Sequence, residues 1–149
     1  MHCLDFSPNG QWIAISSKAN VIIWRLRDGF SRVFEQTGYT SWSVRFSKDG
    51  RYIAAGGDTS IRIWNVRMGE CMASRLVHGG AVEFTRDGKG LVTGSRNNVI
   101  HWGVSLLQST QEDNADGQKE GFKEISRFLG HKVRRSSSLS PLAHLDQPF

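Results

Sequence analysis

A repeated unit is the dominant feature of this chain of 149 residues, which contains three copies of it. Each copy has a five-residue segment in which phenylalanine is followed by serine or threonine, a variable residue, asparagine or aspartate, and glycine. A tryptophan follows each of these phenylalanines after 18 residues, and successive tryptophans are 40 and 38 residues apart. The phenylalanines are Phe6, Phe46 and Phe84, and the tryptophans are Trp24, Trp64 and Trp102. A period of this size predicts stacked supersecondary units that bury their cores against one another.

Short runs of β-branched and aromatic residues fill each copy, and Asn-Gly, Asp-Gly or other glycine-containing turns separate them. Such runs are typical of antiparallel strands joined by hairpins. In the second copy they predict strands at residues 43–46, 51–56 and 60–66, and a fourth strand that ends near Leu76. Four antiparallel strands in one repeat make a propeller blade. The predicted fold class is therefore all-β, with four-stranded antiparallel blades of a β-propeller.

The repeats divide the chain into four segments. Residues 1–36 form a first repeat with a partial start, residues 37–77 a second, and residues 78–132 a third that contains a polar insert at 108–121. Residues 133–149 form a flexible tail rich in serine, arginine and proline. Closed propellers have about four to eight blades, whereas three repeats and the start of a fourth are present here. We expect an incomplete propeller that needs further blades or another chain to close the ring, and a four-blade ring completed by the tail is the disfavoured alternative.

The residues within these repeats resemble a known family. Phe-Ser-x-Asp-Gly is followed by the segments 55–58 (Ala-Gly-Gly-Asp) and 61–65 (Ile-Arg-Ile-Trp-Asn), and residues 130–132 read Gly-His-Lys. This order is similar to that of WD-repeat β-propellers, and the resemblance extends from His2 to about Lys132. In that family the strand tryptophan is commonly followed by aspartate, whereas Arg25, Asn65 and Gly103 follow it here.

The resemblance implies structural roles for several residues. In WD-repeat proteins a loop histidine, a serine or threonine, a turn aspartate and the strand tryptophan form a buried hydrogen-bonded tetrad. Asp58 occupies the turn position, while Lys18 and Arg96 stand there in the other copies, and His131 matches the loop histidine. The fixed position of Trp24, Trp64 and Trp102 favours packing between neighbouring blades, because each tryptophan has a large apolar ring to bury.

The same resemblance implies a function. WD-repeat propellers are non-catalytic scaffolds that bind proteins or peptide motifs on their rims, and the candidate partner-binding residues are Tyr39, Trp42, Arg45, Asp58 and Arg62. Trp42 has no aromatic counterpart in the other copies, which favours an exposed recognition residue. The segment from Val82 to Gly88, with Leu129–Lys132, is also similar to the propellers of fungal Groucho/Tup-type transcriptional corepressors. A propeller scaffold in RNA processing, signalling or ubiquitin-ligase substrate recognition is the alternative.

Composition and motifs argue against other classes of function. The net charge of +5 is spread over scattered arginines, which argues against direct nucleic-acid binding. The chain has no phosphate-binding glycine loop, nucleophile elbow or His-Glu-x-x-His motif, so we expect neither an enzyme nor a cofactor or metal site. No run of residues is long and apolar enough to cross a membrane, and no targeting signal is evident. Cys3 and Cys71 are predicted to be buried, reduced thiols. These features predict an intracellular protein of the nucleus or cytoplasm.

Overall fold

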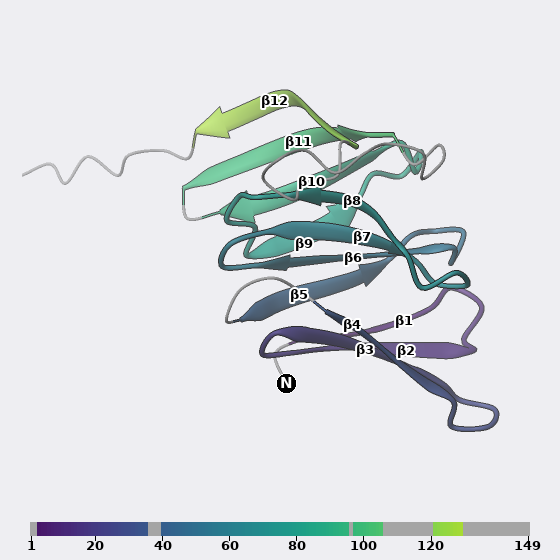
Figure 1. The fold of residues 1–149 in the computed structure, drawn as a ribbon. Helices are drawn as coiled ribbons and strands as arrows, with labels where there is room; N and C mark the ends of the chain where they lie inside the picture. The colour runs from purple at the N-terminus through teal and green to yellow at the C-terminus, as the bar shows by residue number, and fades with distance from the viewer. Residues whose placement is uncertain (1–2, 36–39, 96, 106–120, 130–149) are drawn as a thin grey trace, which may run out of the picture.

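The structure, a computed structural model, describes residues 3–35, 40–95, 97–105 and 121–129. Within these ranges the chain forms twelve strands and no helix. Figure 1 shows the strands stacked as three separate sheets. The strands are β1 (Cys3–Phe6), β2 (Trp12–Ser17), β3 (Asn20–Arg25), β4 (Ser31–Glu35), β5 (Ser41–Phe46), β6 (Tyr52–Gly57), β7 (Ile61–Asn65), β8 (Cys71–Arg75), β9 (Ala81–Phe84), β10 (Gly90–Ser95), β11 (Asn98–Val104) and β12 (Phe122–Leu129).

Each sheet contains four consecutive strands, paired antiparallel in the order in which they occur along the chain. The predicted all-β class and the four-stranded antiparallel blades are thereby confirmed. The insert at 108–121 lies outside the described residues except for its last position, and the predicted tail at 133–149 and the start of a fourth repeat at 130–132 lie outside them entirely. The described ranges contain no helix that is long and apolar enough to cross a membrane.

The turn between the first two strands of each sheet explains the repeated five-residue segment. In the second sheet the Ser47 hydroxyl donates to Asp49 Oδ1 at 2.6 Å, and the same oxygen accepts the Arg51 amide at 3.0 Å. Gly50 has a φ of 70°, a conformation that glycine adopts without steric cost. Burial alone would raise the pKa of Asp49, but the bonds from Ser47 and Arg51 outweigh it and lower the pKa below its ordinary value. Ser7 with Asn9 and Thr85 with Asp87 make the same turn in the other sheets.

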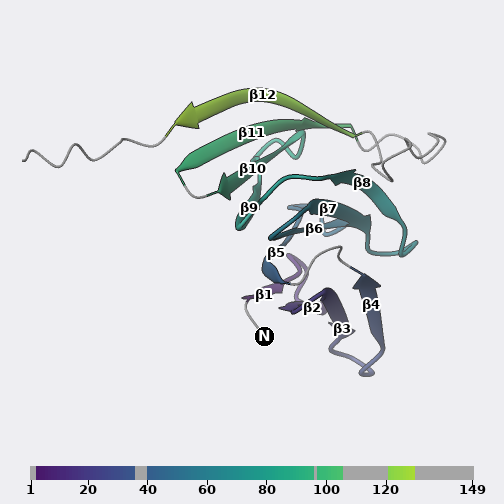
Figure 2. The same cartoon turned by 60° about the vertical axis from the view of Figure 1, so that its left-hand side comes forward.

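Two apolar cores hold the three sheets together. The first lies between the first and second sheets and contains Phe34, Phe46 and Trp64, and the second lies between the second and third sheets and contains Ile63 and Trp102. Contacts between sheets are concentrated at β1, β5 and β9. The sheets therefore converge along these inner strands and fan apart toward β4, β8 and β12, as Figure 2 shows.

The three repeated tryptophans do not share one environment. Trp64 is 3% exposed and Trp102 is 2% exposed, and the Trp102 Nε1–H donates to the Thr93 hydroxyl at 2.9 Å. Trp24 is only half-buried. Its side chain points to the face of the first sheet opposite to Val21 and Ile23, which contact the second sheet. No other sheet of the described residues covers that face, so Trp24 has no sheet to pack against.

Candidate protein-interaction site

The exposed tryptophan lies at a β-bulge. In the pairing of β5 with β6, Ser41 is opposite Gly57 and Ser43 is opposite Gly56, so Trp42 is the extra residue on its strand. A bulge re-aims the side chain of the inserted residue and commonly occurs at functional edges of sheets. Trp42 accordingly points away from the core and is 44% exposed. The sequence identified it as an aromatic residue without a counterpart in the other copies, beside a connecting loop.

Asp58 fixes the orientation of this tryptophan. The Trp42 Nε1–H donates to Asp58 Oδ1, and the Asp58 amide donates to the Thr40 carbonyl at 3.2 Å. These contacts join the start of β5 to the turn between β6 and β7, and we call this surface the Trp42–Asp58 rim (residues 40–42 and 57–60). The resemblance implied a place for Asp58 in a buried tetrad, and the structure shows its carboxylate bonded to a rim tryptophan. The indole N–H thus has a hydrogen-bond partner, and the side chain is 44% exposed.

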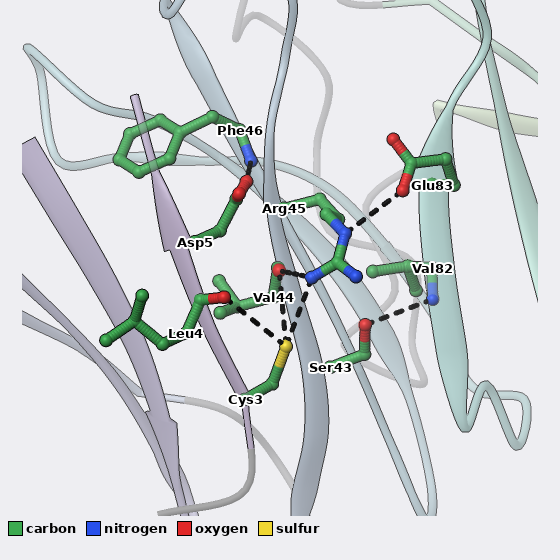
Figure 3. A network of polar contacts seen from close by, with 9 residues as sticks. All are labelled: Cys3, Leu4, Asp5, Ser43, Val44, Arg45, Phe46, Val82 and Glu83. Atoms are coloured by element: carbon green, nitrogen blue, oxygen red, sulfur yellow. Dashed lines mark hydrogen bonds and ion pairs between the residues drawn. The ribbon is translucent and has the colours of Figure 1, made fainter. Parts of the chain in front are cut away.

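Arg45 lies on the inner strand β5 and connects all three sheets. Its Nη1 donates to the Val44 carbonyl at 2.8 Å and lies 3.1 Å from Cys3 Sγ, while its Nε donates to Glu83 Oε2 at 3.0 Å. Figure 3 shows the guanidinium between β1 and β9. Burial tends to lower the pKa of Arg45, but Cys3, Glu83 and Asp5 outweigh it, and the pKa is raised. Arg45 therefore links the sheets through its side chain. It is 34% exposed, so part of the side chain is accessible to a binding partner.

Two further hydrogen bonds join the inner strands. Asp5 Oδ2 accepts the Phe46 amide at 2.7 Å, which links the first sheet to the second. Ser43 Oγ accepts the Val82 amide at 3.3 Å, which links the second sheet to the third (Figure 3). A bond between side chain and backbone at each step holds the inner strands in a fixed register. The loops at their ends are therefore presented on a rigid frame, which suits a binding surface.

Arg62 links the first and second sheets. Its Nη1 donates to the Glu35 carbonyl at 3.2 Å, and its Nε is buried without a partner among the described residues. Of the five candidate partner-binding residues, the structure therefore brings Trp42 and Asp58 together and places Arg45 and Arg62 between sheets. Tyr39 and His131 lie outside the described residues.

The sequence reasoning did not identify a groove at the opposite ends of the strands, between the first two sheets. It has a volume of about 850 Å³ and is lined by Trp12, Arg25, Phe30, Arg32, Gly50, Arg51, Asn65, Val66, Arg67 and Met68. The Arg25 guanidinium lies 5.4 Å from the Trp12 ring centre and 5.0 Å from that of Phe30. Its hydrogen bond to Asp28 lowers the pKa of that carboxyl to about 2. Trp12 and Arg25 pair across β2 and β3, so only the pairing register could have revealed this cluster.

The described residues contain no group of three or more histidine, cysteine, aspartate or glutamate side chains that could hold a metal ion. Neither Cys3 nor Cys71 is in a disulfide, and both are half-buried rather than buried as the sequence predicted. Each stands at the first position of its strand, where packing covers only part of the side chain. The geometry on the rims is that of fixed aromatic and charged surface groups, which suits recognition of another macromolecule.

Comparisons with known proteins agree with this architecture. The model of the WD40 family, described as WD domain, G-beta repeat, matches residues 1–25 and 30–65. A chain in the crystal structure of a mitotic checkpoint complex has a similar fold, with a TM-score of 0.67 and 21% sequence identity. The alignment covers 88% of this chain and 38% of that chain, so the present chain spans well under half of its structural relative. No curated protein matches the chain. The family match thus falls on the first sheet and on most of the second, and neither match bears on the likeness to Groucho/Tup corepressors.

Proposed function

We propose that this chain is part of a non-catalytic protein-interaction scaffold and that a protein partner binds the Trp42–Asp58 rim. The observation that carries the proposal is the tryptophan at the bulge, which is exposed on a rigid sheet and held in one orientation by Asp58. Tryptophan is enriched among the few residues that dominate binding energy at protein interfaces, because it offers a large contact area at low cost in conformational entropy. The WD40 match and the similar fold in a multiprotein complex support this class of function.

The partner surface must complement both groups of the rim. An apolar side chain or proline packs on the exposed part of the Trp42 ring, and a backbone amide or a basic side chain pairs with the Asp58 carboxylate, which has acceptor sites beyond its bond to the indole. Arg45 and Glu83 on the inner strands provide opposite charges that favour one orientation of the partner. A short peptide segment supplies these features more simply than a small metabolite does.

Substitutions at the rim test this proposal in the longest natural form of the protein. We expect Trp42→Ala to reduce capture of the main protein partner at least tenfold, which corresponds to about 1.4 kcal/mol. Trp42→Phe keeps an aromatic ring but loses the N–H, so its affinity for the partner should lie between those of the wild type and Trp42→Ala. The measurement is quantitative affinity purification, followed by titration of the purified partner.

Arg86→Ala is a matched surface control, because Arg86 is in the exposed turn between β9 and β10 and away from the rim. Circular dichroism establishes that each variant is folded. Unchanged partner affinity in a folded Trp42→Ala variant would show that the rim is not the binding surface.

The finer proposal is that the scaffold belongs to a transcriptional corepressor that acts in the nucleus and binds peptide motifs of DNA-bound factors. It is supported by the resemblance of the segment from Val82 to Gly88. Tethering the complete protein to a reporter promoter should reduce transcription, and the double variant Trp42→Ala, Asp58→Ala should lose this effect. Arg45 and Arg62 are unsuitable for this test, because their replacement would also loosen the contacts between sheets. A tethered protein that leaves transcription unchanged would reject the corepressor role and retain the scaffold.

A further inference from the structure

The groove between the first and second sheets is a second accessible surface, at the ends of the strands opposite to the Trp42–Asp58 rim. One wall consists of residues of the first sheet and of the turn before β4, and the other consists of the turn before β6 and the turn after β7. Its volume of about 850 Å³ is within the range of about 300 to 1,000 Å³ that is usual for ligand sites. The two walls belong to sheets that pack on each other, so contacts within the described chain set the shape of the groove.

The lining of the groove is basic, because every charged side chain in it is an arginine. These side chains are Arg25, Arg32, Arg51 and Arg67. Arg25 and Arg51 each pair with a nearby aspartate, at 2.7 and 2.8 Å. Among the described residues, no carboxylate forms an ion pair with Arg32 or Arg67. Two positive charges of the groove are therefore left without a neighbouring negative charge to balance them.

Arg32 reaches from β4 to the second sheet and is held there in one position. Its Nη1 donates to the Val66 carbonyl at 3.1 Å and to the Arg67 carbonyl at 3.0 Å. The guanidinium lies so close to Gly69 that a Cβ on that residue would be 2.8 Å from Nη1. A guanidinium has five N–H donors, so these two bonds leave others for a carboxylate, which it can bind through both oxygens. Because the side chain is already fixed, binding a carboxylate costs little further conformational entropy.

Apolar side chains lie beside these charges. Phe30, in the turn before β4, is 44% exposed, and Met68, in the turn after β7, is 57% exposed. A methionine adapts its shape to irregular apolar partners. The Arg25 guanidinium lies over the rings of Trp12 and Phe30, so it covers a face of each ring on which a nucleic-acid base would stack. The groove therefore favours an apolar side chain over a base.

We propose that this groove binds an acidic peptide segment of a protein partner. Carboxylates of the peptide pair with Arg32 and Arg67, and an apolar side chain next to them packs on Phe30 and Met68. The uncompensated positive charge selects an acidic segment and repels a basic one. The site is separate from the Trp42–Asp58 rim, so the scaffold presents a second binding surface with a different chemical preference.

A set of short fluorescent peptides tests this proposal with the longest natural form of the protein. Each peptide has two glutamates and one phenylalanine in a serine–glycine background, and the spacing of these three residues varies across the set. We expect saturable binding of at least one peptide in fluorescence polarisation, and a weaker affinity as the salt concentration rises. The same peptide with glutamine in place of glutamate forms no ion pairs, so it should bind at least about tenfold more weakly.

Substitutions in the groove locate the binding site. Arg67→Ala should weaken binding of the peptide about tenfold, because this exposed side chain supplies one of the two unbalanced charges. Arg32→Lys keeps the positive charge but loses the planar fork that pairs with both carboxylate oxygens, so it should also weaken binding. Arg86→Ala is the matched control, because it removes an exposed arginine outside the groove and should leave the affinity unchanged. Trp42→Ala should also leave it unchanged, since the rim is at the opposite ends of the strands.

Circular dichroism establishes that each of these variants is folded. Absence of binding throughout the peptide set would overturn the proposal, and so would equal affinity for the glutamate and glutamine forms. Unchanged affinity in a folded Arg67→Ala variant would place the peptide elsewhere, and a loss in Trp42→Ala alone would place it on the rim. A single-stranded oligothymidine that binds more tightly than any peptide, and is lost in Arg67→Ala, would identify nucleic acid as the ligand instead.

Discussion

Replacing Trp64 with alanine is expected to lower the free energy of unfolding by about 3 to 5 kcal/mol. The ring is 3% exposed and is packed in the core between the first and second sheets, with its centre 5.6 Å from that of Phe34. Alanine removes the buried apolar area and leaves a cavity that two hydrogen-bonded sheets cannot collapse to fill. The stability of a whole domain is only about 5 to 15 kcal/mol, so this variant should lose a large fraction of it.

Trp42→Ala is the matched control for this experiment. It also removes a tryptophan side chain from the second sheet, from the edge strand β5, but Trp42 is 44% exposed. Its loss should therefore cost about 1 kcal/mol, mainly through the bond to Asp58. Urea denaturation followed by far-ultraviolet circular dichroism gives both values, at one protein concentration because self-association adds to apparent stability. Equal shifts of the two midpoints would mean that the assignment of Trp64 to the core is incorrect.

The strands and turns were predictable from the sequence because their determinants are local. The repeated segment from phenylalanine to glycine encodes its own turn, in which Ser47 and Asp49 bond to nearby backbone and to each other. Alternation of apolar residues then fixes the face on which each side chain lies. Three copies in register made this inference far stronger than one would have been, and the observed strands in the second sheet begin within two residues of the predicted ones.

The roles of the arginines were not predictable, because their partners come from other sheets. Arg45 bonds to Glu83 and lies against Cys3, and Arg62 bonds to the Glu35 carbonyl. Each of these contacts joins residues at least 27 positions apart, and no spacing within a repeat reveals them. The family resemblance assigned both arginines to the rim, whereas the geometry places them where two sheets meet.

Trp24 shows that an identical register position does not guarantee an identical environment. It matches Trp64 and Trp102 in sequence, yet it is half-buried, because burial depends on a neighbouring sheet as well as on the residue itself. The bulge at Trp42 was likewise invisible in the sequence, since an inserted residue is detected only when the partner strand is known.

Gly56→Ala should be nearly as damaging as the loss of Trp64, although it adds only one methyl group. A Cβ at this position would lie 2.0 Å from the Gly79 carbonyl oxygen and 2.6 Å from Val82 Cγ1. The Gly79 segment cannot withdraw easily, because its amide donates to the Gly57 carbonyl at 3.0 Å. We therefore expect a loss of about 3 kcal/mol, the upper end of the usual cost of overpacking, together with looser packing between the second and third sheets.

Gly80→Ala separates this close contact from a general effect of alanine. The nearest atoms to a Cβ there are the Gly94 carbonyl oxygen at 3.4 Å and His78 Cε1 at 3.7 Å, so the change should cost less than about 1 kcal/mol and could stabilise the chain by restricting its unfolded state. Neither glycine has the left-handed backbone that alanine avoids, so backbone strain does not account for the difference expected between the two variants. Chemical denaturation measures the two stabilities, and hydrogen exchange of the β7 and β9 amides locates the change. If Gly56→Ala were as stable as Gly80→Ala, the second and third sheets could not be in the close contact described here.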